Sequence, residues 1–482
     1  MPAEPVGTRL ARNVALLWVT RGLALGLQLV SFAIIASHLG PSRFGLYAFA
    51  LAMTELLRIL ANFGFETVVT RDLAQQPARE RELVPALLYL RTVAGLAAYG
   101  LLALVLFGAG YGGEQREAAL VAGTLLVLLS IESLIVVLQV RLAMGWVAVA
   151  EIARAIFILA GVVVLARASA GPVAFVWLYV AAAVLAALVP AVAALRRAEL
   201  DWRPRPRLVT RLIRTAWPIG LAGLFIALYY RMDMALLARF KSSADVGQYG
   251  AAYRFLETFA VLPALAMTVV APVLALSFTE SREVLERRFG RAVHLVTVLV
   301  VPIAVVGALT AWRLLPLLPG FGDYEGAGVA LSILAPAAAA LFLATIGQGV
   351  LVAAHLERRL LRVAAWGFAV NLVLNVALIP PYSYVGAAAA TAATEAAVLL
   401  LTAREVRLRL GMRWPMERFR QSVAAGAICA AALIPAYLLH PFLQLAIGLG
   451  VYAVAVIALG TLDRDDVAGL RPFAPRAQSP AQ

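Results

Sequence analysis

Long runs of apolar residues alternate with short polar segments along the whole chain. Many of these runs exceed about 18 residues, which is enough for an α-helix to cross about 30 Å of hydrocarbon. A bilayer offers no partners to backbone N–H and C=O groups, so the runs are predicted to be helices rather than open strands. The pattern predicts fourteen spans, at 13–38, 44–69, 83–109, 117–140, 145–167, 172–195, 209–239, 244–277, 288–312, 327–353, 359–380, 384–407, 419–440 and 442–461.

Composition supports the same class. The chain is 63% hydrophobic and 14% charged, with a mean hydropathy of +0.88, whereas soluble domains are about 45–50% apolar and about 25% charged. We therefore predict an all-α polytopic membrane protein. The single cysteine, Cys429, lies within an apolar run, which excludes an intrachain disulfide and indicates no redox chemistry.

The net charge of +14 is distributed unevenly. With the N-terminus inside, 29 of the 41 basic residues fall in inner segments and six in outer ones. This bias predicts that both termini are cytoplasmic. The first helix is expected to be retained, because a long span follows Arg9 and Arg12 without the short apolar core and small-residue cleavage site of a signal peptide. The most basic stretch, 195–217, is then expected to face anionic headgroups at the inner surface. Nucleic acid is not needed to explain the charge.

A short motif recurs after the first and seventh spans. Gly45 and Tyr47 in the first copy correspond to Gly247 and Tyr249 in the second, at an offset of 202 residues. Six spans separate the copies, so the halves are expected to share orientation and to be related by a pseudo-twofold axis along the membrane normal. The predicted domains are a six-helix bundle at 1–195, a basic cytoplasmic linker at 196–208, a second six-helix bundle at 209–410, and helices 13–14 with a cytoplasmic tail at 411–482.

Several segments together resemble one family. They are Phe44–Tyr47, Asn62–Phe65, Arg231–Asp233, Val246–Tyr249, Asn371–Asn375, Ile379–Pro380, Gly386–Thr391 and Glu395. In this order they resemble the oligosaccharide flippase, or polysaccharide export, branch of the multidrug/oligosaccharidyl-lipid/polysaccharide (MOP) exporter superfamily. The resemblance implies two six-helix bundles around a central cavity, with helices 13 and 14 as an addition beside them.

The same resemblance implies a function. It indicates a flippase, not an enzyme, that moves undecaprenyl-diphosphate-linked glycans by alternating access across the bacterial inner membrane, for O-antigen, capsule or exopolysaccharide assembly. The implied partners are that glycan, membrane lipids, a Na⁺ or H⁺ counter-ion and a glycan polymerase or ligase. The protein itself is expected to be a monomer without cofactors.

The chemistry of such a substrate selects candidate residues within the spans. A diphosphate favours arginine forks, and sugars favour amides and hydroxyls. Ionisable groups inside a membrane usually face a wet cavity or a partner. The predicted residues of the central cavity are Arg21, Arg58, Arg154, Arg231, Arg254, Asn371 and Asn375. The predicted positions for ion coupling are Glu132, Asp233 and Glu257.

Structural interpretations of the same residues remain open. Glu55–Arg58, Glu151–Arg154 and Arg254–Glu257 each have the three-residue spacing that allows a self-neutralising pair on one helix face. Arg91 is expected to extend toward the inner membrane surface. The two asparagines are one turn apart, and hydrogen bonds between helices would also explain them.

Features of the sequence also bear on three alternative functions. A flippase for the lipid-linked peptidoglycan precursor shares the expected plan. A cation-coupled multidrug exporter is disfavoured because the first span lacks the acid that is typical of that branch. A glycan polymerase or ligase is disfavoured because the outer loops are short. No phosphate-binding glycine loop, nucleophile elbow or metal-ligand spacing of histidines occurs, so no metal or nucleotide is expected.

Overall fold

The computed structural model describes residues 6–141, 145–203, 205–258, 281–354, 356–412 and 414–461. Within these ranges, the side chains of 6–21, 74–75, 218, 222, 226, 357 and 416–418 are not described. All regular elements of the described part are helices, which confirms the all-α class. Ten of these helices are long and apolar enough to cross a membrane.

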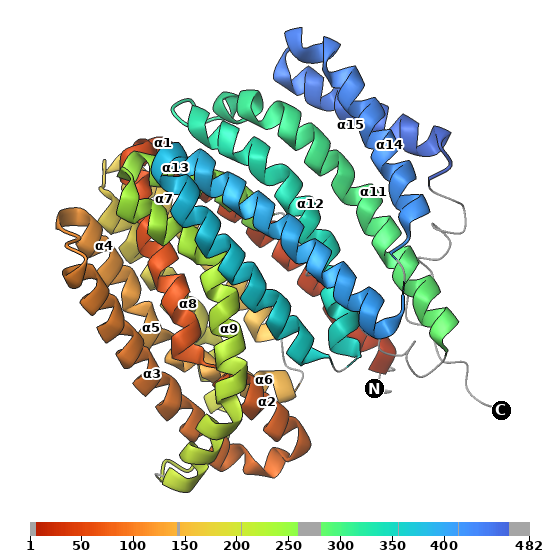
Figure 1. Ribbon diagram of the computed structural model, residues 1–482. Helices are drawn as coiled ribbons and strands as arrows, with labels where there is room; N and C mark the ends of the chain where they lie inside the picture. The colour runs from red at the N-terminus through yellow and green to blue at the C-terminus, as the bar shows by residue number, and fades with distance from the viewer. Residues whose placement is uncertain are drawn as a thin grey trace. The chain divides into compact units, whose positions relative to one another are not determined.

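Residues 1–247 form the first of two compact units, here called unit 1. Its helices are α1 (Val6–Asn62), α2 (Phe65–Gln75), η1 (Pro77–Arg79), α3 (Glu80–Gly108), α4 (Gly113–Gly123), α5 (Leu125–Leu128), η2 (Leu129–Leu134), α6 (Ile135–Val140), α7 (Gly145–Arg167), α8 (Pro172–Leu195) and α9 (Pro206–Phe240). Helix α7 packs against both α1 and α8, and α3 packs against α1, as Figure 1 also shows. Helix α9 packs against α1 and α2, and its Leu208, Leu212 and Ala216 enter the apolar core of the unit.

Helix α1 contains two spans joined at a break. Its 57 residues would extend about 85 Å as a straight helix, more than twice the hydrocarbon thickness. Gly40 breaks it with φ 65° and ψ 170°, and Pro41 cannot donate a backbone hydrogen bond. This confirms the predicted division between the first two spans. The predicted second span runs too far, because left-handed Phe63 (φ 42°) and Gly64 (φ 76°) end α1 at Asn62.

The predicted fourth span, 117–140, is not one continuous α-helix. It is divided into α4, α5, the 3₁₀ helix η2 and α6. A 3₁₀ segment has three residues per turn and is uncommon within a long helix, where it often marks a functional hinge. Glu132 and Ser133 both lie on η2, so this irregularity coincides with polar side chains in the middle of a span.

Residues 248–482 form unit 2. Helical residues 243–258 cross the boundary between the units, and the predicted eighth span, 244–277, leaves the described residues after 258. The following helices are α11 (Arg282–Leu314), η3 (Leu315–Leu317), α12 (Glu325–Ala353), α13 (Glu357–Leu410), α14 (Met416–Leu433), η4 (Pro435–Leu438) and α15 (Pro441–Ala458). Helix α12 packs against both α11 and α13, and the α14–α15 pair packs against α11 (Figure 1).

Helix α13 also contains two predicted spans. Its 54 residues are broken at Ser383 (φ 53°, ψ −134°), just after Pro380 and Pro381. The break lies within the predicted gap between 380 and 384. Its two halves fold back on each other, as the hydrogen bond from Asn371 Nδ2 to Thr394 Oγ1 at 3.5 Å indicates.

Arg313, near the end of α11, holds the C-terminal helix pair. Its guanidinium donates to the carbonyl oxygens of Tyr437 and Leu439 and to Gln444 Oε1. It also lies over the Tyr437 ring, 4.7 Å from the centroid. These contacts satisfy backbone groups between α14 and α15 that helix geometry leaves unpaired.

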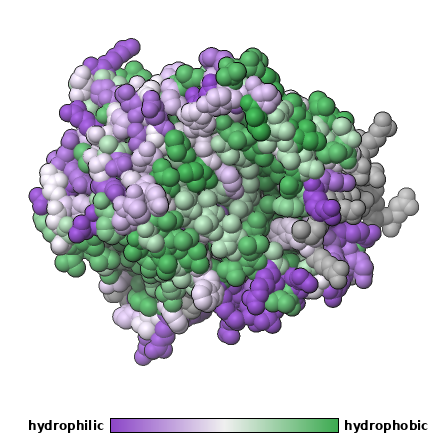
Figure 2. All heavy atoms as spheres, turned by 45° about the horizontal axis from the view of Figure 1, so that its top comes forward, coloured by the Kyte–Doolittle hydropathy of each residue, from purple (hydrophilic) through white to green (hydrophobic). Residues whose placement is uncertain are grey.

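Many large apolar side chains are exposed. Leu438, Ile457 and Leu400 are 89%, 75% and 71% exposed. On the face shown in Figure 2, apolar side chains form broad areas and hydrophilic ones gather in separate groups. Exposed apolar surface on this scale is expected where helices contact lipid rather than water.

The predicted bundle boundaries and the pseudo-twofold axis stay predictions. The compact units divide at Gly247, whereas the repeat predicts a division at the linker 196–208. The two motif glycines both belong to unit 1 and lie in close backbone contact. A Cβ on Gly45 would overlap Ser243 O, and one on Gly247 would overlap Pro41 O. Glycine at these positions is therefore required by packing.

Candidate functional site

Unit 1 contains a group of charged side chains inside its helices, here called the charged cluster (Glu55, Arg58, Glu66, Arg91 and Glu132). Arg58, on α1 after the break, donates to two carboxylates. Its Nη1 lies 3.3 Å from Glu55 Oε1, and its Nη2 lies 3.0 Å from Glu132 Oε2. The Glu55–Arg58 pair therefore forms as one interpretation predicted, but η2 adds a second acid. Glu132, a predicted ion-coupling residue, is held by an arginine.

Arg91 is the most deeply buried member of the cluster. Its side chain is 4% exposed, its Nη1 lies 3.5 Å from Glu66 Oε2, and the same nitrogen donates to Ser133 Oγ at 3.2 Å. The expectation that Arg91 reaches toward the membrane surface was wrong. A buried guanidinium needs a carboxylate partner, and α2 supplies one because the Phe63–Gly64 break turns the chain at that point.

A cavity of about 220 Å³, here called the polar cavity, opens beside this cluster. Its lining includes three carboxylates, two guanidiniums and one phenol from α1, η2, α7 and α8: Glu55, Arg58, Glu132, Glu151, Arg154 and Tyr179. Aliphatic and alanine side chains complete the wall. The fold thus brings together Arg58, Arg154 and Glu132, three residues that the sequence assigned to the site.

Glu151 and Arg154 differ from the pair on α1. Although they have the same spacing, no ion pair or hydrogen bond of either side chain occurs among the described residues. The self-neutralising pair expected here does not form. Arg154 therefore presents an uncompensated guanidinium to the polar cavity, where it is available to an oxyanion.

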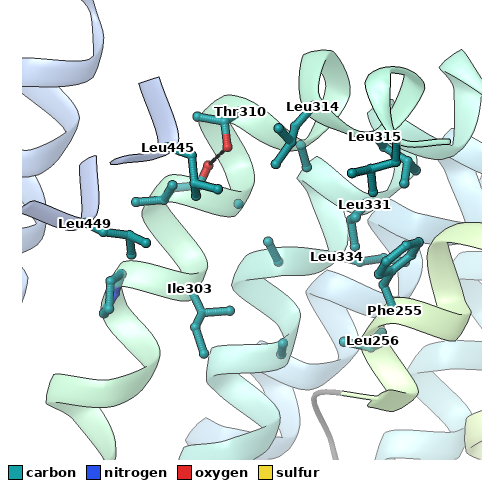
Figure 3. A pocket seen from close by; sticks show the side chains of 17 residues that line it. Phe255, Leu256, Ile303, Thr310, Leu314, Leu315, Leu331, Leu334, Leu445 and Leu449 are labelled. Atoms are coloured by element: carbon teal, nitrogen blue, oxygen red, sulfur yellow. Dashed lines mark hydrogen bonds between the residues drawn. The ribbon is translucent and has the colours of Figure 1, made fainter. Parts of the chain in front are cut away.

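A second cavity, of about 370 Å³, lies within unit 2 and is here called the apolar cavity. It is lined by Phe255 and Leu256 of the helix at 243–258, and by aliphatic residues of α11, η3, α12 and α15. Figure 3 shows these side chains around the space. The one hydroxyl in the lining, that of Thr310, donates to Val306 O at 2.7 Å. The wall offers dispersion contacts and scarcely any hydrogen bonds.

The predicted asparagines lie in neither cavity. Asn375 Nδ2 donates to Asn371 O and Oδ1 at 2.9 Å, and Asn371 bonds Thr394 on the other half of α13. Both asparagines are 0–1% exposed. This geometry agrees with the interpretation that they link helix segments. Tyr249 of the repeated motif joins the same helix half through its hydroxyl, 3.2 Å from Thr391 Oγ1.

The remaining predicted residues are dispersed. Arg254 Nη1 lies 3.2 Å from Glu257 Oε2, so this pair neutralises itself within one helix turn. Asp233 is 2% exposed, and its Oδ1 accepts the backbone N–H of Met234 at 2.7 Å. Arg231 is half-buried on α9. Arg21 lies in α1, but its side chain is outside the described residues.

Sequence reasoning missed Glu66, Ser133 and Tyr179. Glu66 was detectable, because it is an acid within a predicted span and directly follows the segment Asn62–Phe65. Ser133 and Tyr179 carry no comparable signal, since hydroxyl groups are common in membrane helices. Among the described residues, no group of three or more His, Cys, Asp or Glu side chains is placed to hold a metal ion.

The sequence of this chain matches two known protein families. Residues 10–278 match the polysaccharide biosynthesis protein family, and residues 218–377 match the MatE family. The probable flippase AglR of Haloferax volcanii is 28% identical over 206 residues, which are 42% of this chain and 43% of that protein. The match therefore spans less than half the length of that relative.

Solved structures share the fold at low sequence identity. Lipid II flippase MurJ in an inward closed conformation is similar with a TM-score of 0.78 and 13% identity, over 92% of this chain and 98% of that one. An inward-facing multidrug resistance MATE family transporter of the MOP superfamily gives a TM-score of 0.61 and 15% identity, over 80% and 94%. Because the first family match covers more than half of the 482 residues, the chain belongs to the polysaccharide biosynthesis protein family.

Proposed function

We propose that this protein translocates undecaprenyl-diphosphate-linked oligosaccharide units across the bacterial inner membrane by alternating access, with both termini in the cytoplasm. The product would enter O-antigen, capsule or exopolysaccharide assembly, and the monomer would deliver it to a glycan polymerase or ligase. The observation that carries the proposal is the polar cavity, where Arg154 has no ion-pair partner among the described residues. Membership of a polysaccharide biosynthesis family supports the class of cargo.

The polar cavity also suggests how an ion is coupled to transport. Three carboxylates and two guanidiniums line it, so its formal charge is −1 when all are ionised. Arg58 forms ion pairs with Glu55 and Glu132, which leaves Glu151 as the carboxylate that can bind a cation. One H⁺ or Na⁺ at Glu151 would bring the lining to neutrality, and Arg154 would then attract a diphosphate without opposition. Glu132 stays the second candidate for the coupling acid.

The apolar cavity supports the lipid part of the cargo. A hydrocarbon chain loses hydration and gains dispersion contacts in such a space, whereas a polar group would lose hydrogen bonds. We propose that it receives part of the isoprenoid tail. Arg21, Arg231, Arg254, Asn371 and Asn375 stay candidate cavity residues of lower rank, because the described contacts of the last three already explain them.

Deletion of the gene in its own organism tests the proposal. We expect undecaprenyl-linked oligosaccharide to accumulate on the cytoplasmic side, and complementation to restore surface glycan. Accumulation of lipid-linked peptidoglycan precursor would favour the alternative flippase. Altered drug susceptibility with unchanged glycans would favour a multidrug exporter, and either result would overturn the proposal.

Two variants test the cavity chemistry directly. Arg154→Met removes a charge-assisted bond to phosphate worth about 1.5–3 kcal/mol, so we expect roughly a tenfold to hundredfold loss of diphosphate affinity. Glu151→Gln removes the competing carboxylate and is expected to raise that affinity and to abolish its dependence on Na⁺. Arg141→Met, at an ion pair with Glu80 outside this cavity, serves as the control. Equal binding by the wild type and Arg154→Met would contradict the assignment.

A further inference from the structure

Several arginines near the helix ends of unit 1 are paired with acids. In unit 1, Arg141 lies 2.8 Å from Glu80, and Arg79 lies 2.6 Å from Glu82. Arg205 contacts both Glu82 and Asp201, and its hydrogen bond holds the pKa of the Asp201 carboxyl below its usual range. Acids close enough to hydrogen-bond therefore offset these arginines, as expected for charges that hold a structure together.

Among the described side chains of unit 2, the arginines at the two ends of α13 lack such compensation. Six arginines occupy its first two and last two turns: Arg358, Arg359, Arg362, Arg404, Arg407 and Arg409. Glu405 is the one carboxylate among them whose side chain is described, and Glu357 adds a second by sequence. Arginines thus outnumber acids by six to two even when Glu357 is counted. We call this group the α13 arginine cluster.

Glu405 is shared without a close contact to any arginine. Its carboxylate lies 4.0 Å from Arg359, 3.9 Å from Arg404 and 3.7 Å from Arg409. These separations exceed hydrogen-bonding distance, and Glu405 Oε2 is buried with no hydrogen-bond partner. Arg359 comes from the start of α13 and the other two come from its end. The fold therefore brings like charges from both helix halves to one place and leaves most of their donors unused.

The arginines of this cluster lie near the ends of two helix halves that are longer than the hydrocarbon core of a bilayer. Each half of α13 is about 26 residues, or about 39 Å, which exceeds the hydrocarbon core by about 9 Å. The arginines occupy the terminal turns, so they lie at headgroup depth when the halves span the bilayer. Leu408, between Arg407 and Arg409, is 59% exposed, so an apolar side chain accessible to lipid chains lies next to these arginines in the helix.

We propose that the α13 arginine cluster binds the phosphate of an anionic membrane phospholipid. A phosphate placed among Arg359, Arg404 and Arg409 accepts hydrogen bonds that Glu405 does not take up, and its charge draws the two ends of α13 together. The occupant is a structural lipid of the surrounding bilayer and not the transported molecule. This inference is independent of the identity of the cargo.

The test measures lipid-dependent stability of the full-length protein. The detergent-solubilised protein is titrated with phosphatidylglycerol or phosphatidylcholine, and the thermal midpoint and the phosphatidylglycerol retained in native mass spectra are recorded. We expect stabilisation by phosphatidylglycerol alone. Arg404→Gln with Arg409→Gln is expected to weaken this binding by about 30-fold, because each arginine near anionic lipid contributes about fivefold. The control, Arg79→Gln with Arg141→Gln, removes the same charge from two acid-paired arginines of unit 1 and is expected to leave the response unchanged.

One further variant is expected to strengthen phosphatidylglycerol binding instead of weakening it. Glu405→Gln removes the competing carboxylate, so we expect tighter phosphatidylglycerol binding and a larger shift of the midpoint. Weaker binding in this variant would overturn the proposal. So would an equal response to phosphatidylcholine, an equal loss in the unit 1 control, or a response to pyrophosphate without one to phosphatidylglycerol.

Discussion

The ion pair between Glu66 and Arg91 is expected to contribute measurably to the free energy of unfolding. Arg91 is 4% exposed, and its charge is offset by Glu66 at 3.5 Å and by the Ser133 hydroxyl. Glu66→Leu leaves the guanidinium buried without an acid in direct contact. Removing one partner of a buried pair destabilises proteins by about 3–5 kcal/mol. Glu66 itself is 26% exposed, so we expect the lower end of this range, about 3 kcal/mol.

The double variant Glu66→Leu with Arg91→Met removes both charges together. Apolar replacement of a complete buried pair is often neutral, so we expect most of the lost stability to return and a coupling energy of about 2 kcal/mol. The free energy of unfolding would be measured by denaturant titration in micelles with tryptophan fluorescence. Glu55→Leu is the control, because Arg58 keeps Glu132 at 3.0 Å and both groups are partly exposed. A cost below about 1 kcal/mol for Glu66→Leu, or additive single and double variants, would refute this reasoning.

Three further changes have definite expected outcomes. Arg313→Met frees the carbonyl groups between α14 and α15, so we expect roughly tenfold faster amide exchange in 416–458 with little change elsewhere. Unchanged amide protection in 416–458 would contradict the assigned role of Arg313. Gly95→Leu places a Cβ against Leu126 O and is expected to destabilise unit 1 by about 1–3 kcal/mol, measurable by denaturant titration. Leu334→Trp fills the apolar cavity and is expected to reduce crosslinking of a photoactivatable isoprenoid, whereas Leu400→Trp, at an exposed position, is not.

The positions of most spans followed from hydropathy alone. The ranges 145–167 and 172–195 coincide with α7 and α8 at both ends. The gaps predicted between 38 and 44 and between 380 and 384 contain the breaks of α1 at Gly40 and of α13 at Ser383. These features are local, because span length and backbone breaks depend on neighbouring residues and on the thickness of the bilayer.

The features that escaped prediction depend on contacts between distant segments. Nothing near Arg91 in sequence reveals that Glu66 and Ser133 surround it, since the Phe63–Gly64 turn and the η2 segment create that environment. Likewise, Glu55–Arg58 and Glu151–Arg154 are indistinguishable by spacing. Only the fold shows that Arg58 is held by two acids, whereas Arg154 lines the same cavity without an ion-pair partner among the described residues.

The central claim is that the polar cavity acts in moving a diphosphate-linked glycan across the membrane. Its most direct test is translocation of undecaprenyl-diphosphate-linked oligosaccharide in proteoliposomes, with sidedness read by an impermeant glycosidase. We expect the wild-type protein to expose the glycan to the opposite face, and Arg154→Met to lose this activity while inserting normally. Failure of the wild type to move this lipid under an imposed H⁺ or Na⁺ gradient, or full activity of Arg154→Met, would contradict the account.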